Sequence, residues 1–139
     1  MDDKAAEQVM AAFASAYFSG DRRRLEEVIT EDAEWHFAFG RDAPHGRVRR
    51  GVEGFMLGMQ ENAGLFERLR FNDVVIRALG EDQIVMTYLA EGRRHDGEPF
   101  ALRGIELITV RDGRLTMKDV FWKQETDEGT PPWQSAAGD

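Results

Sequence analysis

The fold is decided by one stretch of the chain, RGIELITVRDGRLTMKDVFWK at residues 103–123. Apolar and polar residues alternate on both sides of Asp112-Gly113, a dipeptide typical of tight β-hairpins. We therefore expect two long antiparallel strands, at residues 98–110 and 114–123. Three charged residues lie among the apolar side chains of these strands: Glu106, Lys118 and Asp119. At least one of these charges is expected to enter an apolar interior.

The length of the hairpin turn decides which of these charges share a face. A two-residue turn would place Glu106 beside Asp119, whereas a three-residue loop over 111–113, with Gly113 in the left-handed region, pairs Glu106 with Lys118. Opposite charges are favoured at facing positions, so we predict the three-residue loop. The predicted inner face consists of Glu106, Ile108, Val110, Thr116, Lys118, Val120 and Trp122. The predicted outer face consists of Ile105, Leu107, Leu115, Met117, Asp119 and Phe121.

The rest of the chain predicts helices followed by a β-meander. Apolar residues recur at helical spacing from Lys4 to Phe18, and Asp21 is placed to cap a second, shorter helix. A strand is expected at 33–39, with Trp35 and Phe37 on one side and Glu34 and His36 on the other. The other expected elements are a loop at 40–51, a helix at 52–66, and strands at 69–79 and 83–94. Because the later strands follow one another without intervening helices, the fold class is α+β, with a curved antiparallel sheet around the helices.

Length and composition limit the possible functions. The 139 residues fit one domain, which we place at 1–124, followed by a flexible tail at 125–139. Trp133 of this tail is a candidate to dock onto the domain. The net charge of −8 argues against nucleic acid or an anionic membrane as a partner. The absence of cysteine excludes disulfides and thiol catalysis. The first residues lack a basic-then-apolar signal, so we expect a cytoplasmic protein.

Four short motifs, in this order and at this spacing, resemble the SnoaL-like group of the nuclear transport factor two superfamily. They are Ser19-Gly20-Asp21, the run EDAEWH at 31–36, Arg50-Gly51-Val52 and the run VRDGRL at 110–115. The resemblance covers about residues 6–123 and implies a cone-shaped α+β barrel. The superfamily includes ketosteroid isomerases, limonene-type epoxide hydrolases, polyketide cyclases and non-catalytic modules, so the fold does not select a function.

Most catalytic residues of these relatives are replaced here. The helix-one tyrosine and the aspartate base of ketosteroid isomerases correspond to Phe13 and Phe37, and their oxyanion-hole aspartate corresponds to Glu106. The arginine and two aspartates of limonene-type epoxide hydrolases correspond to Leu89, Glu91 and Val120. The aspartate of SnoaL-type cyclases also falls at Val120, next to Asp119. Neither the isomerase nor the hydrolase mechanism transfers intact.

The candidate catalytic residues are Glu106, Lys118, Glu91 and His36. The candidate ligand-binding residues are Phe13, Tyr17, Trp35, Phe37, Phe55, Met59, Val120 and Trp122. A buried glutamate and lysine also satisfy each other without catalysis, and strict alternation places His36 outside the cup unless the strand is bulged. The apolar residues fit an ordinary core equally well. His36, His45 and His95 lack short ligand spacing, so we predict no metal and no cofactor.

The leading hypothesis is a SnoaL-like enzyme that performs acid–base chemistry, such as isomerisation, cyclisation or hydration, on an apolar cyclic or polyketide-like substrate. In this hypothesis Glu106 is the acid or base, Lys118 tunes it or stabilises an oxyanion, and Glu91 or His36 supplies a second proton-transfer group. The alternatives are a non-catalytic ligand-binding module and a scaffold that forms homodimers through the outer face of the sheet. A scaffold predicts that Trp35, Phe55, Met59 and Trp122 fill the cavity.

Overall fold

The computed structural model describes residues 1–42 and 44–124. The predicted tail at 125–139, including Trp133, lies outside these described residues. The described residues form three helices and six strands, in the order α1 (Asp3–Ser19), α2 (Arg22–Val28), β1 (Ile29–His36), β2 (Val48–Arg50), α3 (Gly51–Leu65), β3 (Phe66–Leu79), β4 (Gln83–Arg94), β5 (Pro99–Arg111) and β6 (Arg114–Trp122). The predicted elements are therefore present, but the strand expected at 33–39 begins earlier and ends at His36, so residues 37–39 lie outside it. The expected loop at 40–51 also contains the short strand β2.

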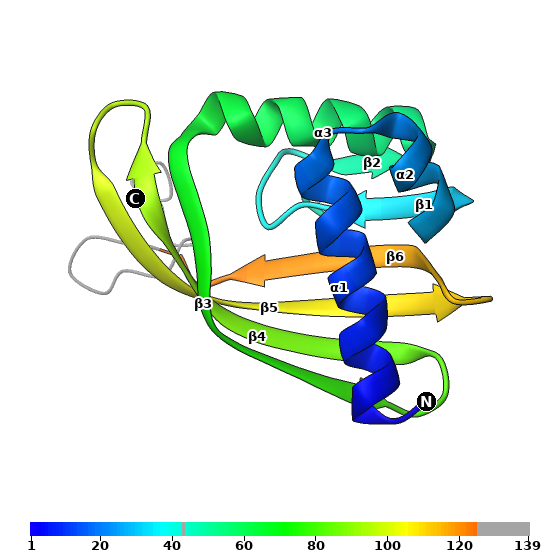
Figure 1. The fold of residues 1–139 in the computed structure, drawn as a ribbon. Coiled ribbons are helices and arrows are strands. Elements are labelled where there is room, and N and C mark those ends of the chain that lie inside the picture. The colour runs from blue at the N-terminus through cyan, green and yellow to red at the C-terminus, as the bar shows by residue number, and fades with distance from the viewer. Residues whose placement is uncertain (43, 125–139) are drawn as a thin grey trace.

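The six strands form one curved, open sheet in the order β2-β1-β6-β5-β4-β3. All neighbouring strands run antiparallel except β1 and β6, which are parallel. The sheet is therefore mixed, whereas the sequence predicted only antiparallel pairs. Helix α1 crosses the face of the long strands and α3 runs along the β1 and β2 end of the sheet (Figure 1). This arrangement confirms the predicted cone-shaped α+β fold, with β2 and β3 as free edges.

The turn between β5 and β6 has two residues, so the predicted three-residue loop is wrong. Asp112 and Gly113 have φ values of 53° and 76°, and Arg111 pairs with Arg114. These are the features of a type I′ turn, which Asp-Gly favours because both residues tolerate positive φ. The turn alone would place Glu106 opposite Asp119.

A β-bulge in β6 restores the predicted faces. Val110 pairs with Leu115 but Thr109 pairs with Met117, so Thr116 is the extra residue and the register shifts by one. Beyond the bulge, Glu106 lies opposite Val120, Ile108 lies opposite Lys118, and Leu107 lies opposite Asp119. Glu106 and Lys118 therefore share the inner face as diagonal neighbours, while Asp119 belongs to the outer face.

The bulge also corrects the prediction for Leu115. We expected this side chain on the outer face, but it is fully buried in the core. Thr116 instead brings its hydroxyl to within 3.0 Å of the Thr30 hydroxyl of β1. The bulge therefore lies where the parallel strand β1 joins the hairpin, and the β1–β6 register is also irregular there, between Ile29 and Glu34.

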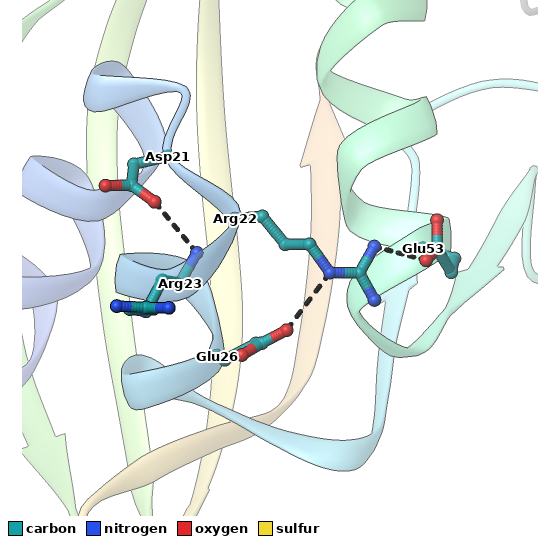
Figure 2. A network of polar contacts seen from close by, with 5 residues as sticks. All are labelled: Asp21, Arg22, Arg23, Glu26 and Glu53. Carbon is teal, nitrogen blue, oxygen red and sulfur yellow. Dashed lines mark hydrogen bonds and ion pairs between the residues drawn. The ribbon is translucent and has the colours of Figure 1, made fainter.

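Polar side chains fix the beginning of α2 and connect it to α3. Asp21 accepts a hydrogen bond of 2.9 Å from the backbone N–H of Arg23, which confirms the predicted N-cap. Arg22 donates to Glu26 within α2 and to Glu53 on α3 (Figure 2). Arg22 therefore joins α2 to α3.

Helix α3 packs tightly on β1 because Gly58 has no side chain. A Cβ atom at this position would lie 2.7 Å from the ring of Trp35 and 2.9 Å from the ring of Phe37. The absence of a side chain at Gly58 therefore lets α3 approach these two rings closely. Within the described residues, no helix is both long and apolar enough to cross a membrane.

Candidate functional site

A cavity of about 700 Å³ opens between α1, α3 and the concave face of the sheet. Seven of the predicted ligand-binding residues line it: Phe13, Tyr17, Trp35, Phe37, Met59, Val120 and Trp122. Phe55 does not line it. This side chain is fully buried, and its ring centroid lies 6.3 Å from that of Phe13 and 5.6 Å from that of Trp35. Phe55 therefore supports the wall of the cavity from behind.

Glu106 and Lys118 form a buried ion pair at the wall of this cavity. The Nζ atom of Lys118 donates to Oε1 of Glu106 over 2.6 Å, and the two side chains are only 9% and 2% exposed, respectively. Both residues line the cavity. The contact predicted from the sequence is thus present, although it joins diagonal rather than facing positions. It places one carboxylate and one ammonium group in an otherwise largely apolar chamber.

Tyr88 is a partner of Glu106 that the sequence analysis missed. Its hydroxyl donates to Oε2 of Glu106 over 2.6 Å and accepts from Nε1 of Trp122 over 2.8 Å. Burial, with the negative charge of Glu106 as the next cause, raises the pKa of Tyr88 well above its ordinary value, so the phenol stays protonated. Met86, Tyr88 and Ala90 occupy every second position of β4 and point to its buried face. This period-two pattern could have identified Tyr88 as an inward-facing residue from the sequence.

The contact between Tyr88 and Trp122 depends on a glycine between them. Tyr88, Gly104 and Trp122 occupy neighbouring positions on β4, β5 and β6. A Cβ atom on Gly104 would lie 2.7 Å from the tyrosine ring and 2.8 Å from the tryptophan ring. A glycine inside a strand often marks such a close approach. The two rings therefore meet above Gly104 and complete a chain of hydrogen bonds, which runs Trp122, Tyr88, Glu106 and Lys118.

Lys118 is also surrounded by aromatic rings. Its Nζ atom lies 5.2 Å from the ring centroid of Trp35 and 6.0 Å from that of Phe13, within the range of cation–π attraction. Among the described residues, Glu106 is the one hydrogen-bond acceptor of this ammonium group. Since an ammonium group carries three donors, two N–H groups remain for a ligand.

Glu91 and His36 do not reach the cavity. Glu91 lies on the other face of β4, where it accepts from Nδ2 of Asn72. His36 is buried on the face of β1 opposite Trp35, as strict alternation predicted, with Nε2 2.9 Å from Oε1 of Glu34. The hydrogen bond with His36, together with a weaker effect of Arg50, lowers the pKa of Glu34. The structure therefore brings together two of the four candidate catalytic residues.

Asn62 is a second lining residue that the sequence did not single out. Its Nδ2 atom donates to the Tyr17 hydroxyl over 3.4 Å, and both side chains line the cavity. Burial raises the pKa of Tyr17 above its ordinary value. The sequence gives no signal for Asn62, because α3 contains several polar residues and only the fold shows that this one faces Tyr17 of α1. These two side chains are the neutral hydrogen-bonding pair of the helical wall, which also contains Glu7.

Among the described residues, no group of three or more His, Cys, Asp or Glu side chains is placed to hold a metal ion. The expectation of chemistry without a metal or cofactor remains a prediction from the residue pattern. What the cavity offers chemically is the buried Glu106–Lys118 pair and the neutral donors of Tyr17 and Asn62, in a mainly apolar surrounding. Four further charged residues also line it: Glu7, Glu67, Arg68 and Arg70.

A family model described as the SnoaL-like domain matches residues 7–117. No curated protein matches the chain in sequence. Several solved structures share its fold. An NTF2-like protein from Burkholderia xenovorans LB400 is 22% identical, with a TM-score of 0.74, over 88% of this chain and 92% of that chain.

Two other solved structures are similar over comparable lengths. A protein proposed to be a polyketide cyclase, from Xanthomonas campestris pv. campestris, is 21% identical, with a TM-score of 0.71, over 87% of this chain and 92% of that one. A loop-truncation variant of IdmH is 28% identical, with a TM-score of 0.65, over 85% and 92%. At these identities the structural likeness supports the fold, and it leaves the reaction to be argued from the site.

Proposed function

Because this chain belongs to the SnoaL-like family, we propose that it is an enzyme that performs cofactor-free acid–base chemistry on an apolar cyclic or polyketide-like small molecule. The reaction class is isomerisation, cyclisation or hydration. One observation carries the proposal: the Glu106–Lys118 pair is buried at the wall of an open, mainly apolar cavity of about 700 Å³. A buried ion pair is a costly way to stabilise a fold, so its position at the wall of a ligand-sized cavity points to a functional role.

The proposed chemistry is a proton transfer at Glu106. Its carboxylate takes a proton from a carbon next to a substrate carbonyl, the C–H bonding pair becomes part of an enolate, and the carbonyl oxygen takes the negative charge. Return of the proton to another atom of the substrate regenerates the carboxylate. Lys118 holds one carboxylate oxygen, and its remaining N–H groups are available to a developing oxyanion. Tyr88 holds the other oxygen and fixes the orientation of the carboxylate.

A non-catalytic binding module is the second candidate, and one observation favours it. Both oxygens of Glu106 have partners, and no fully buried side-chain nitrogen or oxygen among the described residues lacks one. Such a network is also complete without a reaction. The scaffold hypothesis has less support, because Trp35, Met59 and Trp122 surround an open cavity instead of filling it.

The test compares Glu106→Gln and Lys118→Met with wild type on a panel of cyclic ketones and polyketide-like compounds. The proposal expects turnover to fall by roughly a hundredfold or more in Glu106→Gln while binding is retained, the usual scale for loss of a general base. Exposed Glu98→Gln and Lys4→Met are matched controls that keep wild-type turnover. Unchanged turnover in both cavity variants would remove these residues from the mechanism, and binding without any turnover by wild type would favour the module.

We further propose that the protein is cytoplasmic, that residues 1–124 form a single domain, and that it forms a homodimer through the outer face of the sheet. Ile105, Leu107 and Phe121 on this face are 36%, 36% and 48% exposed. Ile105 and Phe121 lie side by side, in one row with Val75, which is 43% exposed. Exposed apolar patches of this kind mark interfaces. A monomeric mass by light scattering at micromolar concentration would contradict the dimer.

A further inference from the structure

The polar pair on the helical wall of the cavity, Tyr17 and Asn62, has hydrogen-bonding capacity that the protein does not use. In the 3.4 Å contact the tyrosine oxygen is the acceptor, so the phenolic hydrogen is left over. Asn62 likewise keeps one N–H and its carbonyl oxygen. Among the described residues neither side chain has another hydrogen-bond partner. The cavity therefore presents two unused donors side by side, one from α1 and one from α3.

The charge state of these donors selects the kind of ligand. Burial raises the pKa of Tyr17, with a smaller contribution from the negative charge of Glu106, so the phenol remains a donor at neutral pH. The charge of Glu106 is itself paired with that of Lys118. Two neutral donors side by side suit an uncharged oxygen acceptor, which needs no counter-charge.

We propose that Tyr17 and Asn62 bind the carbonyl oxygen of a neutral cyclic ketone. The ring of Trp35 connects this site with the ion pair: its centroid lies 6.0 Å from that of Tyr17 and 5.2 Å from Nζ of Lys118. A fused-ring ketone that lies along Trp35 with its oxygen at Tyr17 extends toward Glu106 and Lys118. The carbonyl site stands on its own contacts, and its use in a reaction rests on the function proposed above.

The test is the preference of the full chain for α-tetralone over tetralin, two ligands that differ in one carbonyl oxygen. Both ligands are titrated by calorimetry into wild type and into each variant. The ratio of the two affinities in a variant is then compared with the ratio in wild type. Because the free ligands are the same in every titration, differences in their hydration cancel in this comparison. Tyr17→Phe and Asn62→Ala are each expected to lower this ratio by roughly threefold to tenfold, the value of one net hydrogen bond, with the affinity for tetralin unchanged.

The chain offers matched controls. Gln8→Ala and Gln60→Ala change exposed polar residues of α1 and α3, the two helices that carry the pair, and neither residue lines the cavity. Both are expected to keep the wild-type ratio. The proposal is overturned if Tyr17→Phe and Asn62→Ala keep this ratio, or if the affinity for tetralin falls in parallel with that for α-tetralone. The latter result assigns the pair to joining α1 and α3.

The same ligand separates this inference from the proposed function. If wild type prefers α-tetralone through Tyr17 and Asn62 but does not exchange the hydrogens next to its carbonyl, the carbonyl site is supported and the acid–base function is not. If exchange occurs while the preference is unaffected by the two variants, the function is supported and the carbonyl site is not.

Discussion

Two ion pairs, one within the β5–β6 hairpin and one that joins this hairpin to β1, have the same length and opposite surroundings. Lys118 and Glu106 are joined over 2.6 Å with side chains 9% and 2% exposed, whereas Arg111 and Asp32 are joined over 2.6 Å with side chains 54% and 65% exposed. Exposed pairs contribute little to stability, because water already solvates both charges. In a buried pair, each charge has lost its water and depends on its partner. Burial therefore decides what each contact is worth.

The same comparison explains why only one pair is a candidate for chemistry. Asp32 has Arg111 beside it and bulk solvent around it, so its carboxylate is not positioned to act on a bound ligand. Glu106 is held on both oxygens, by Lys118 and Tyr88, and faces a cavity large enough for a ligand. Substitutions in the buried pair should therefore affect stability strongly, and substitutions in the exposed pair only weakly.

The largest loss of stability is expected for Glu106→Leu. The substitution leaves the Lys118 ammonium group buried without its counter-charge, so the free energy of unfolding should fall by about 3–5 kcal/mol. Urea denaturation monitored by circular dichroism measures the difference. A fall of less than about 1 kcal/mol would show that the pair is hydrated and that the contrast with the surface pair is wrong.

The double variant Glu106→Leu/Lys118→Met sharpens the first prediction. With both charges replaced by apolar side chains of similar size, we expect most of the lost stability to return, to within about 1 kcal/mol of wild type or above it. The same denaturation experiment applies, and an additive loss in the double variant would contradict the coupling. Because the variant lacks both cavity charges, it should also have no turnover.

A smaller loss is expected for Tyr88→Phe. The substitution removes the hydroxyl that bonds both Glu106 and Trp122, and one or two net hydrogen bonds correspond to about 1–3 kcal/mol, with the higher value for a charged acceptor. Tyr17→Phe is the matched control, since its hydroxyl has one contact of 3.4 Å, and it should cost clearly less. Equal losses of stability in the two variants would imply that the hydrogen bonds of Tyr88 to Glu106 and Trp122 contribute no more to stability than the single contact of Tyr17.

The smallest effect is expected for Asp32→Asn, whose unfolding midpoint at neutral pH should lie only slightly below that of wild type, because solvent screens the exposed pair. The hydrogen bond from Arg111 lowers the pKa of Asp32 from 3.8 to about 2. A depressed pKa stabilises the fold above the ordinary value and loses this contribution as the pH falls toward 2. Any difference between Asp32→Asn and wild type should therefore disappear at the acid end of that range. A clear loss of stability at neutral pH would contradict the contrast.

The sequence predicted the partners of the buried ion pair, but not the turn and the strand register that bring them together. Alternation placed Glu106 and Lys118 on one face, and charge complementarity placed them in contact. The turn was predicted incorrectly because Asp112 adopts a positive φ, and a second deviation, the bulge at Thr116, cancelled the error. A bulge at an ordinary threonine leaves no local signal, because it arises where β1 joins the hairpin.

The missed residues show the same limit. Tyr88 was within reach of period-two reasoning, but its partners Glu106 and Trp122 lie 18 and 34 positions away, so only the sheet register connects them. Asn62 lies 45 positions from Tyr17 on another helix. Glu91, which was assigned from family resemblance, lies on the outer face because its neighbour Ala90 points inward. Local pattern thus predicts faces, and contacts between elements require the fold.

The proposal that the buried Glu106 carboxylate transfers protons can be tested by following the exchange of substrate hydrogens with solvent. α-Tetralone is incubated in deuterated water with wild type, Glu106→Gln or the exposed control Glu98→Gln, and loss of the hydrogens next to the carbonyl is followed by proton NMR. We predict that wild type and Glu98→Gln accelerate the exchange, and that Glu106→Gln binds the ketone but exchanges it at the buffer rate. Exchange by Glu106→Gln as fast as by wild type, or no acceleration by wild type when it binds the ketone, would contradict the claim.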